Sequence, residues 1–190
     1  MKVNKSIIWP LILMVILASV YRALPGRPFG FAPQWAIAIF AGAIVNNRFM
    51  ALLLPLVSMF LSDLLYHMLF INSLGSVPGF YEGQWVNYIL FTGVTILGFF
   101  MRKITIRNIA WFSFIGPTAF FIVSNFLVWA GHGGWGRPTT VNGLLLSYAD
   151  GLPFYGWSLV STLLFSLILF GSWYFVVRRQ AVAKEEIINN

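Results

Sequence analysis

The chain has 190 residues, of which 59% are hydrophobic, 18% aromatic and only 9% charged, and its formal net charge at pH 7 is +7. Soluble domains carry about 25% charged residues, so a water-soluble globule of this composition would lack the polar surface to cover itself. This balance excludes a soluble enzyme and a disordered tail, and it indicates an integral membrane protein whose main surroundings are the lipid bilayer.

The positive charge does not indicate nucleic-acid binding, because the basic residues stand at the ends of apolar segments rather than on one face. We therefore expect no nucleic-acid partner. The chain has no cysteine, which excludes a disulfide, a thiol nucleophile and a thiolate metal site.

A membrane-crossing helix needs about 20 mainly apolar residues, because the hydrocarbon core is about 30 Å thick. The sequence predicts an all-α membrane protein, a bundle of about six transmembrane helices with structured outer loops. Residues 1–179 form this single domain, and residues 180–190 form a polar cytoplasmic tail. The spans are expected near Ile7–Arg22, Phe31–Val45, Phe49–Phe70, Asn87–Met101, Asn108–Ala130 and Leu152–Val177.

The Lys and Arg residues predict the orientation of these spans. With the N-terminus in the cytoplasm, nine of the 12 basic residues fall on the inner side and three, Arg22, Arg27 and Arg137, on the outer side. This asymmetry satisfies the positive-inside rule, so both termini are expected in the cytoplasm. No small-x-small cleavage site follows the first span cleanly, and we expect that span to be retained rather than removed as a signal peptide.

Small residues mark one face of the second span. Ala38 and Gly42 have the four-residue spacing that lets helix backbones approach closely in membranes. The face serves either as an internal contact or as a docking surface for a partner subunit, and we expect internal packing.

Asp63 is the only acidic residue within a predicted span. A charge at membrane depth is costly, so it usually faces the bundle interior and has a partner. His67 lies four residues later on the same helical face, and Arg22, at the outer end of the first span, is placed to pair with Asp63. The pair is either a packing contact between two helices or an anchor for a ligand or a proton.

Asn125 is a second polar point within a span, and we expect it to hydrogen-bond between helices. The longest outer connection was expected over Gly131–Gly151, with His132, Trp135 and Arg137 in it. Long structured loops often carry binding function, and aromatic concave sites with few polar groups are typical of small-molecule pockets. Each tryptophan by itself, Trp129 and Trp135 included, equally fits the aromatic belt of a membrane protein.

Motifs of membrane enzymes are missing from the sequence. There is no Gly-x-Ser-x-Gly turn, no His-Glu-x-x-His and no glycine-rich phosphate-binding loop. Two histidines supply too few nitrogen ligands for a zinc site without help. We therefore predict that the protein is not an enzyme, has no catalytic residues and no metal site, and uses no cofactor.

Four stretches together resemble a family of small bacterial inner-membrane proteins of unknown function. They are Arg22–Pro25 continuing to Pro33, Leu54-Pro55 with Ser62–Leu64, Asn125-Phe126 with Trp129, and Thr139, Gly143-Leu144 and Tyr148 with Leu152–Phe154. The stretches cover nearly the whole chain in order. The resemblance implies a multi-pass protein of the bacterial cytoplasmic (inner) membrane.

That family in turn looks like the substrate-binding S components of energy-coupling-factor vitamin transporters in size and topology. The likeness implies capture of a small vitamin-like molecule from the outer side, with a separate ATPase module or another membrane subunit as partner. It differs in one motif: the Ala-x-x-x-Ala typical of the first S-component helix is absent, and Ala18 and Ala23 have another spacing.

Two functions follow as hypotheses. In the first, the protein binds and transports a small molecule through Arg22, Asp63, His67, Asn125, Trp129, Trp135, Arg137 and Tyr148. In the second, it is a non-transporting scaffold subunit of a cell-envelope assembly, with its outer loops as docking surfaces and Asp63 in a structural ion pair.

Overall fold

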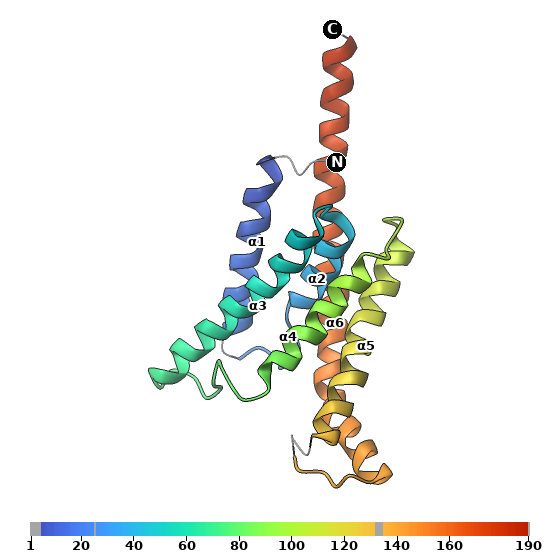
Figure 1. Cartoon of the computed structure of the whole chain (residues 1–190). Coiled ribbons are helices and arrows are strands. Elements are labelled where there is room, and N and C mark those ends of the chain that lie inside the picture. The colour runs from blue at the N-terminus through green and yellow to red at the C-terminus, as the bar shows by residue number, and fades with distance from the viewer. Residues whose placement is uncertain (1–4, 25, 132–134, 190) are drawn as a thin grey trace.

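The computed structural model describes residues 5–24, 26–131 and 135–189, and these contain six helices and no strand (Figure 1). The helices are α1 (Lys5–Ala23), α2 (Gln34–Ile44), α3 (Arg48–Ile71), α4 (Gln84–Gly98), α5 (Ile106–Ala130) and α6 (Val141–Asn189). The all-helical prediction is confirmed, and each predicted span overlaps one helix. His132 lies outside the described residues.

Three of the helices are long and apolar enough to cross a membrane. They are α3, α5 and the part of α6 from Val141 to Val177. Together with the composition, they indicate a membrane protein. Helix α2 has only 11 residues, which corresponds to a length of about 16 Å at a rise of about 1.5 Å per residue.

The connection between α5 and α6 is shorter than predicted. We expected a loop over Gly131–Gly151, but α6 begins at Val141 and includes Asp150. Asp63 is therefore not the only acidic residue in a helix. The prediction was wrong because Pro138 and the two threonines that follow it start a helix there: the carbonyl of Thr140 accepts the amide of Leu144, and its hydroxyl accepts that of Gly143.

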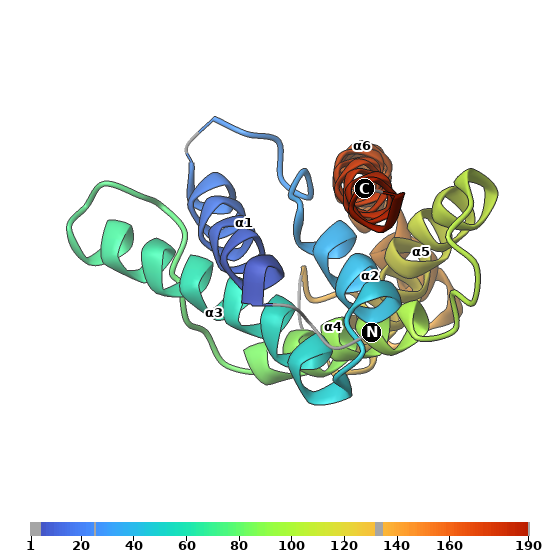
Figure 2. The ribbon, with the colours of Figure 1, turned by 90° about the horizontal axis from the view of Figure 1, so that it is seen from above.

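Helix α2 lies at the centre of the bundle and contacts α3, α4, α5 and α6. The view from above shows α1 and α3 on one side of it and α5 and α6 on the other (Figure 2). Five of its alanines and isoleucines are fully buried, namely Ala36, Ile37, Ala38, Ile39 and Ala41. Small side chains make this position possible, because they let several helices approach one axis.

The closest approach joins α2 to α4 through two glycines. A Cβ atom on Gly42 would lie 2.2 Å from the carbonyl oxygen of Thr95, and one on Gly98 would lie 2.7 Å from that of Ile39. No side chain fits in that space. The small face at Ala38 and Gly42 is therefore an internal contact, which confirms the expectation of internal packing.

Polar residues set the starts of two long helices. The side chain of Asn47 accepts the amide of Met50 at the start of α3, and the hydroxyl of Thr105 accepts the amide of Asn108 at the start of α5. Such caps satisfy amides that have no partner inside the helix. In Figure 1 these two connections lie toward one end of the bundle and the three longer ones toward the other.

The connection between α1 and α2, residues 24–33, is held from two sides. Its Arg27 donates to the carbonyl of Phe31 and to the hydroxyl of Tyr66 on α3. On the other side, Ser158 of α6 donates to the carbonyl of Gly30 over 3.2 Å. This segment therefore ties α3 to α6, which have α2 between them.

Gly42→Ala tests the α2–α4 contact. The new methyl group would meet backbone that cannot rotate away, so we expect a loss of roughly 1–3 kcal/mol in unfolding free energy, as for other overpacked positions. Gly93→Ala on α4 is the matched control, because a Cβ there meets nothing within 4 Å, and it should stabilise by up to about 1 kcal/mol. Equal effects of the two substitutions on unfolding in detergent would contradict the close approach.

Candidate functional site

The first polar cluster surrounds Asp63 on α3, whose side chain is buried. Arg22 at the end of α1 forms an ion pair with its Oδ1 atom, as the sequence predicted, and also donates to the hydroxyl of Ser62 over 2.5 Å. Asp63 is only 3% exposed. The charge of this carboxylate is thus neutralised across the α1–α3 contact.

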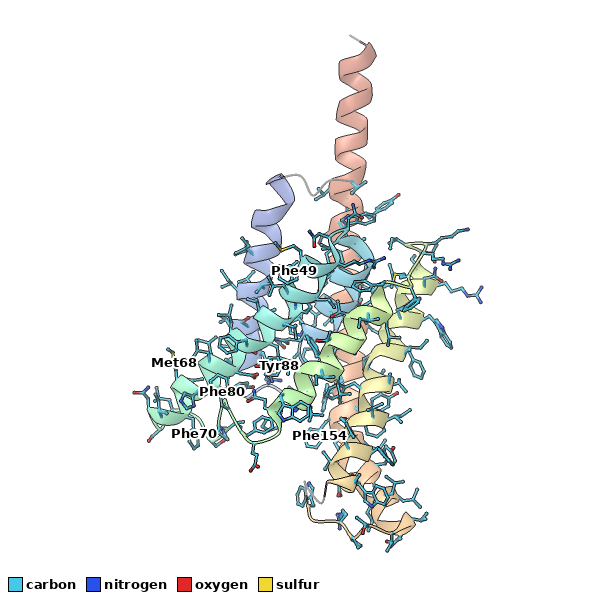
Figure 3. All side chains as sticks on the ribbon, in the orientation of Figure 1. Phe49, Met68, Phe70, Phe80, Tyr88 and Phe154 are labelled. Atoms are coloured by element: carbon cyan, nitrogen blue, oxygen red, sulfur yellow. The ribbon has the colours of Figure 1, made fainter. Side chains whose placement is uncertain are left out.

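The second carboxylate oxygen of Asp63 is held by α4. Gln84 donates its amide to Oδ2 over 2.7 Å, and the hydroxyl of Tyr88 donates to the same atom over 2.6 Å. Figure 3 labels Tyr88, which projects from α4. Gln84 and Tyr88 are one helical turn apart, so they share a face. Three helices therefore meet at one carboxylate.

The connection between α3 and α4 closes this cluster from the side. A Cβ on Gly79 would lie 1.9 Å from the carbonyl oxygen of Asp63, and the carbonyl of Gly79 accepts the Gln84 amide over 3.1 Å. Gly79 thus packs directly on the backbone of α3. The connection leaves little room for a ligand next to the carboxylate.

Both oxygens of Asp63 have strong donors, and burial removes the competition from water. A buried carboxylate with an ion-pair partner and hydrogen bonds from neutral side chains meets the conditions under which a buried charge is tolerated. A ligand that binds Asp63 must displace Arg22, Gln84 or Tyr88. The geometry therefore favours the interpretation of the pair as a contact that docks helices.

His67 does not join the Asp63 cluster. Its ring packs against Phe80, with 5.4 Å between the ring centroids, and this is its only side-chain interaction within the residues that the structure describes. Its backbone amide and Cβ lie against Gly79. The four-residue spacing correctly placed His67 on the same helix face, but the loop between α3 and α4 covers it.

A cavity of about 150 Å³ lies on the other side of α2, between α2, α5 and α6. Aromatic side chains make up half of its lining. The lining residues are Trp35, Pro117, Phe120, Phe121, Ser124, Asn125, Gly151, Phe154, Tyr155 and Ser158. Phe154, which Figure 3 labels, is one of the lining residues from α6. The two polar regions are therefore on different parts of the bundle.

Asn125 presents its amide group beside this cavity. Its Nδ2 atom donates to the carbonyl of Phe121, one turn earlier in α5, over 2.8 Å. The expectation that Asn125 bonds between helices through its side chain is wrong, because this amide bonds to a carbonyl of its own helix. Only its backbone carbonyl links to α6, through the hydroxyl of Ser147 over 3.2 Å.

The remaining predicted residues lie where α5 ends and α6 begins. Arg137 forms a bidentate ion pair with Asp150, in which its Nε and Nη2 atoms donate to the two carboxylate oxygens over 2.8 and 2.9 Å. This hydrogen bonding raises the pKa of Arg137 above its usual value. Trp129 donates its indole N–H to the carbonyl of Pro138 over 3.0 Å. Trp135 is 79% exposed.

Tyr148 connects this group to the cavity. Its hydroxyl donates to the carbonyl of Ile122 over 3.0 Å, and its ring packs on Phe121, with the ring centroids 5.6 Å apart. Phe121 also stacks on Tyr155 over 4.6 Å. The end of α5 and the start of α6 thus lie directly next to the cavity wall.

The predicted residues form three groups rather than one binding site. Arg22 and Asp63 are in contact with each other, Asn125 lies at the cavity, and Trp129, Arg137 and Tyr148 lie where α5 ends and α6 begins. Sequence reasoning missed Gln84, Tyr88 and the aromatic lining of the cavity. The four-residue spacing of Gln84 and Tyr88 at the start of an apolar helix was a usable signal, whereas the aromatic lining resembles any other lipid-facing aromatics in the sequence.

Among the residues the structure describes, no group of three or more His, Cys, Asp or Glu side chains is placed to hold a metal ion.

The fold and these sites define an all-helical membrane protein with one buried ion-pair cluster and one aromatic cavity. The chain belongs to a family of unknown function, DUF6580, whose match covers residues 2–184. This supports the resemblance to a family of unknown function, whereas nothing links that family to the S components of vitamin transporters. No curated protein and no solved structure matches the chain.

Asp63→Asn tests the structural role of the first cluster. Removing the charge leaves Arg22 without its partner, and we expect a loss of about 2–3 kcal/mol in unfolding free energy. This is less than the roughly 3–5 kcal/mol for a fully buried pair, because the Arg22 side chain is 23% exposed.

A double-mutant cycle with Arg22→Gln separates the pair from general damage. The double variant should be more stable than the sum of the two single losses predicts, by at least about 1 kcal/mol. Arg102→Gln, at an exposed position, is the control and should leave stability unchanged. Purely additive losses would show that the two side chains do not depend on each other.

The ion pair of Arg137 and Asp150 should hold the segment before α6 in place. Arg137→Ala and Asp150→Ala are each expected to speed amide hydrogen exchange over residues 135–140 several-fold. The double variant should exchange no faster than either single variant, because the same contact is lost in all three. Exchange rates equal to those of the unsubstituted protein would mean that the pair does not order this segment.

Proposed function

We propose that this protein is a multi-pass protein of the bacterial cytoplasmic membrane that binds a small, vitamin-like molecule from the outer side and takes part in its transport. The observation that carries the proposal is the aromatic cavity between α2, α5 and α6. Concave sites with aromatic walls and a few polar groups are the usual form of a small-molecule site.

The proposal places all six helices across the membrane with both termini inside. Nine basic residues then lie on the inner side and three on the outer side, in accordance with the positive-inside rule. The shortness of α2 is compatible with this topology because the surrounding helices separate it from lipid. A short buried helix needs no hydrophobic match to the bilayer.

The size of the cavity limits what it holds. A cavity of about 150 Å³ accommodates a molecule of about the size of benzene. We infer that it receives one ring of the ligand, through Asn125 and the surrounding aromatic side chains. The group of Trp129, Trp135, Arg137 and Tyr148, at the outer ends of α5 and α6, then forms the entrance.

A separate partner must supply the energy in this proposal, because the sequence has no phosphate-binding glycine loop. The likeness to S components in size and helix number suggests an ATPase module or another membrane subunit. Likeness of fold alone is weak evidence of function. The partner is therefore proposed from this likeness, and the cavity by itself does not indicate one.

One observation favours a second function, a membrane scaffold. Both carboxylate oxygens of Asp63 accept from strong donors within the chain, as a docking contact between helices requires. In a scaffold, the outer ends of α5 and α6 would bind another protein. The cavity would then be a packing gap and would bind no ligand selectively.

A ligand screen distinguishes the two functions. Detergent-purified protein would be tested against vitamins and their precursors by tryptophan fluorescence and thermal shift, because Trp35 lines the cavity. We expect one compound to give a saturable response. Ser124→Phe, which fills part of the cavity, should weaken this response by at least about tenfold, since an overfilled site excludes the ligand ring.

The matched control is Ser172→Phe, which changes an exposed serine on α6. It should leave binding unchanged. If folded protein gives no response to any compound, the transport proposal fails and the scaffold becomes the supported function.

A further inference from the structure

The hydrogen-bonding groups around the cavity are unequally available. The hydroxyl of Ser158 donates to the carbonyls of Phe154 and Gly30 over 2.9 and 3.2 Å, and that of Ser124 donates to the carbonyl of Phe121. Each serine hydroxyl has only one proton to donate. The proton of each of these two hydroxyl groups is therefore already used in hydrogen bonding to backbone carbonyls.

The hydroxyl of Tyr155 is committed in the same way. Thr118 donates to the carbonyl of Phe114 over 2.6 Å, so the hydrogen bond of 2.8 Å between Thr118 and Tyr155 must use the tyrosine proton. A hydroxyl group has a single proton. None of the three hydroxyl groups on the cavity wall thus has a proton left for a ligand.

Asn125 differs from these residues because the carbonyl oxygen and one N–H of its amide group have no partner among the described residues. A primary amide has two N–H donors and one carbonyl acceptor. One N–H bonds to the carbonyl of Phe121, which also fixes which end of the amide is nitrogen. The Oδ1 atom and the second N–H have no hydrogen-bond partner within the described part of the chain.

The rest of the lining specifies the other properties of the ligand. None of the ten lining residues is charged, so a charged group would lose its hydration there without compensation. Five lining residues are aromatic, namely Trp35, Phe120, Phe121, Phe154 and Tyr155. Walls of this kind favour a flat ring by stacking and edge contacts.

We propose that the cavity selects an uncharged aromatic ring that carries an amide, either a carboxamide or a lactam within the ring, and that the Asn125 side chain is the residue that recognises it. An amide presents an acceptor and a donor side by side, which complements the free carbonyl and N–H of Asn125. This inference rests on the proposed function and names the substrate class of the same site.

Gly151 is the positioning residue for this contact. A Cβ at Gly151 would lie 2.6 Å from Oδ1 and 2.9 Å from Nδ2 of Asn125. The amide group of Asn125 therefore rests against the bare backbone of α6. A methyl group here would push the flexible end of the asparagine aside while leaving most of the ring-binding wall in place.

The test uses four simple probes with the full-length protein in lipid nanodiscs. Benzamide and 2-pyridone carry the amide, toluene is a ring without hydrogen-bonding groups, and benzoate carries a charge. Binding would be followed by the change in Trp35 fluorescence, with Trp35→Phe as the variant that lacks this reporter. We expect benzamide and 2-pyridone to bind at least about tenfold more tightly than toluene or benzoate, as two added hydrogen bonds predict.

Two variants test the assigned residues. Asn125→Leu should bring benzamide affinity down to that of toluene, while toluene binding stays within about twofold. Gly151→Ala should reduce benzamide binding and leave toluene binding nearly unchanged. Gly156→Ala is the matched control on α6, because a Cβ there meets nothing within 4 Å, and it should bind all probes like the unsubstituted protein.

The outcomes separate this inference from the function on which it rests. Equal binding of benzamide and toluene, or a preference for amides that survives Asn125→Leu, overturns the inference and leaves a small-molecule site. Tight binding of benzoate also overturns the inference alone. No binding of any probe or of any vitamin, by protein shown to be folded, overturns both.

Discussion

The rest of the bundle depends on the close packing of α2 within the other helices. Its alanines and Gly42 let α4 come within backbone contact, so that the carbonyl of Thr95 occupies the place of a side chain. This helix fills the centre of the bundle. Polar groups and empty space are instead displaced to either side of α2: the Asp63 cluster between α1, α3 and α4, and the cavity between α2, α5 and α6.

These two sites use their polar groups in opposite ways. Around Asp63, the carboxylate has an ion-pair partner and two further donors from α4, so its hydrogen-bonding capacity is met by the protein itself. At the cavity, the hydroxyl protons are already used in hydrogen bonds within the protein, whereas the carbonyl oxygen and one N–H of the Asn125 amide have no partner among the described residues. A site that is already satisfied stabilises packing, whereas an unmet donor and acceptor side by side make a group available to another molecule. Asp63 is thus held by contacts that join helices, whereas Asn125 presents at the cavity an N–H and a carbonyl oxygen that have no partner among the described residues.

Much of the fold could be predicted from the sequence. Hydropathy alone located all six helices, and the cost of a buried charge predicted the partner of Asp63. Helix ends were less predictable: the start of α6 at Val141 depends on a local hydrogen bond at Thr140 that no hydropathy pattern reveals. The sequence could not predict which candidate residues lie together, because that depends on which helices are neighbours. Asn125 illustrates this limit, because its side chain hydrogen-bonds to a carbonyl of its own helix rather than to a neighbouring helix.

The segment between α1 and α2 changes how this molecule can be labelled and engineered. Surface loops usually tolerate inserted residues, but residues 24–33 bond to α3 through Arg27 and to α6 through Gly30. A Cβ at Gly30 would also lie 2.2 Å from the carbonyl oxygen of Phe154. An epitope or a fluorescent domain placed in this loop would disturb its contacts with α3 and with α6 at the same time.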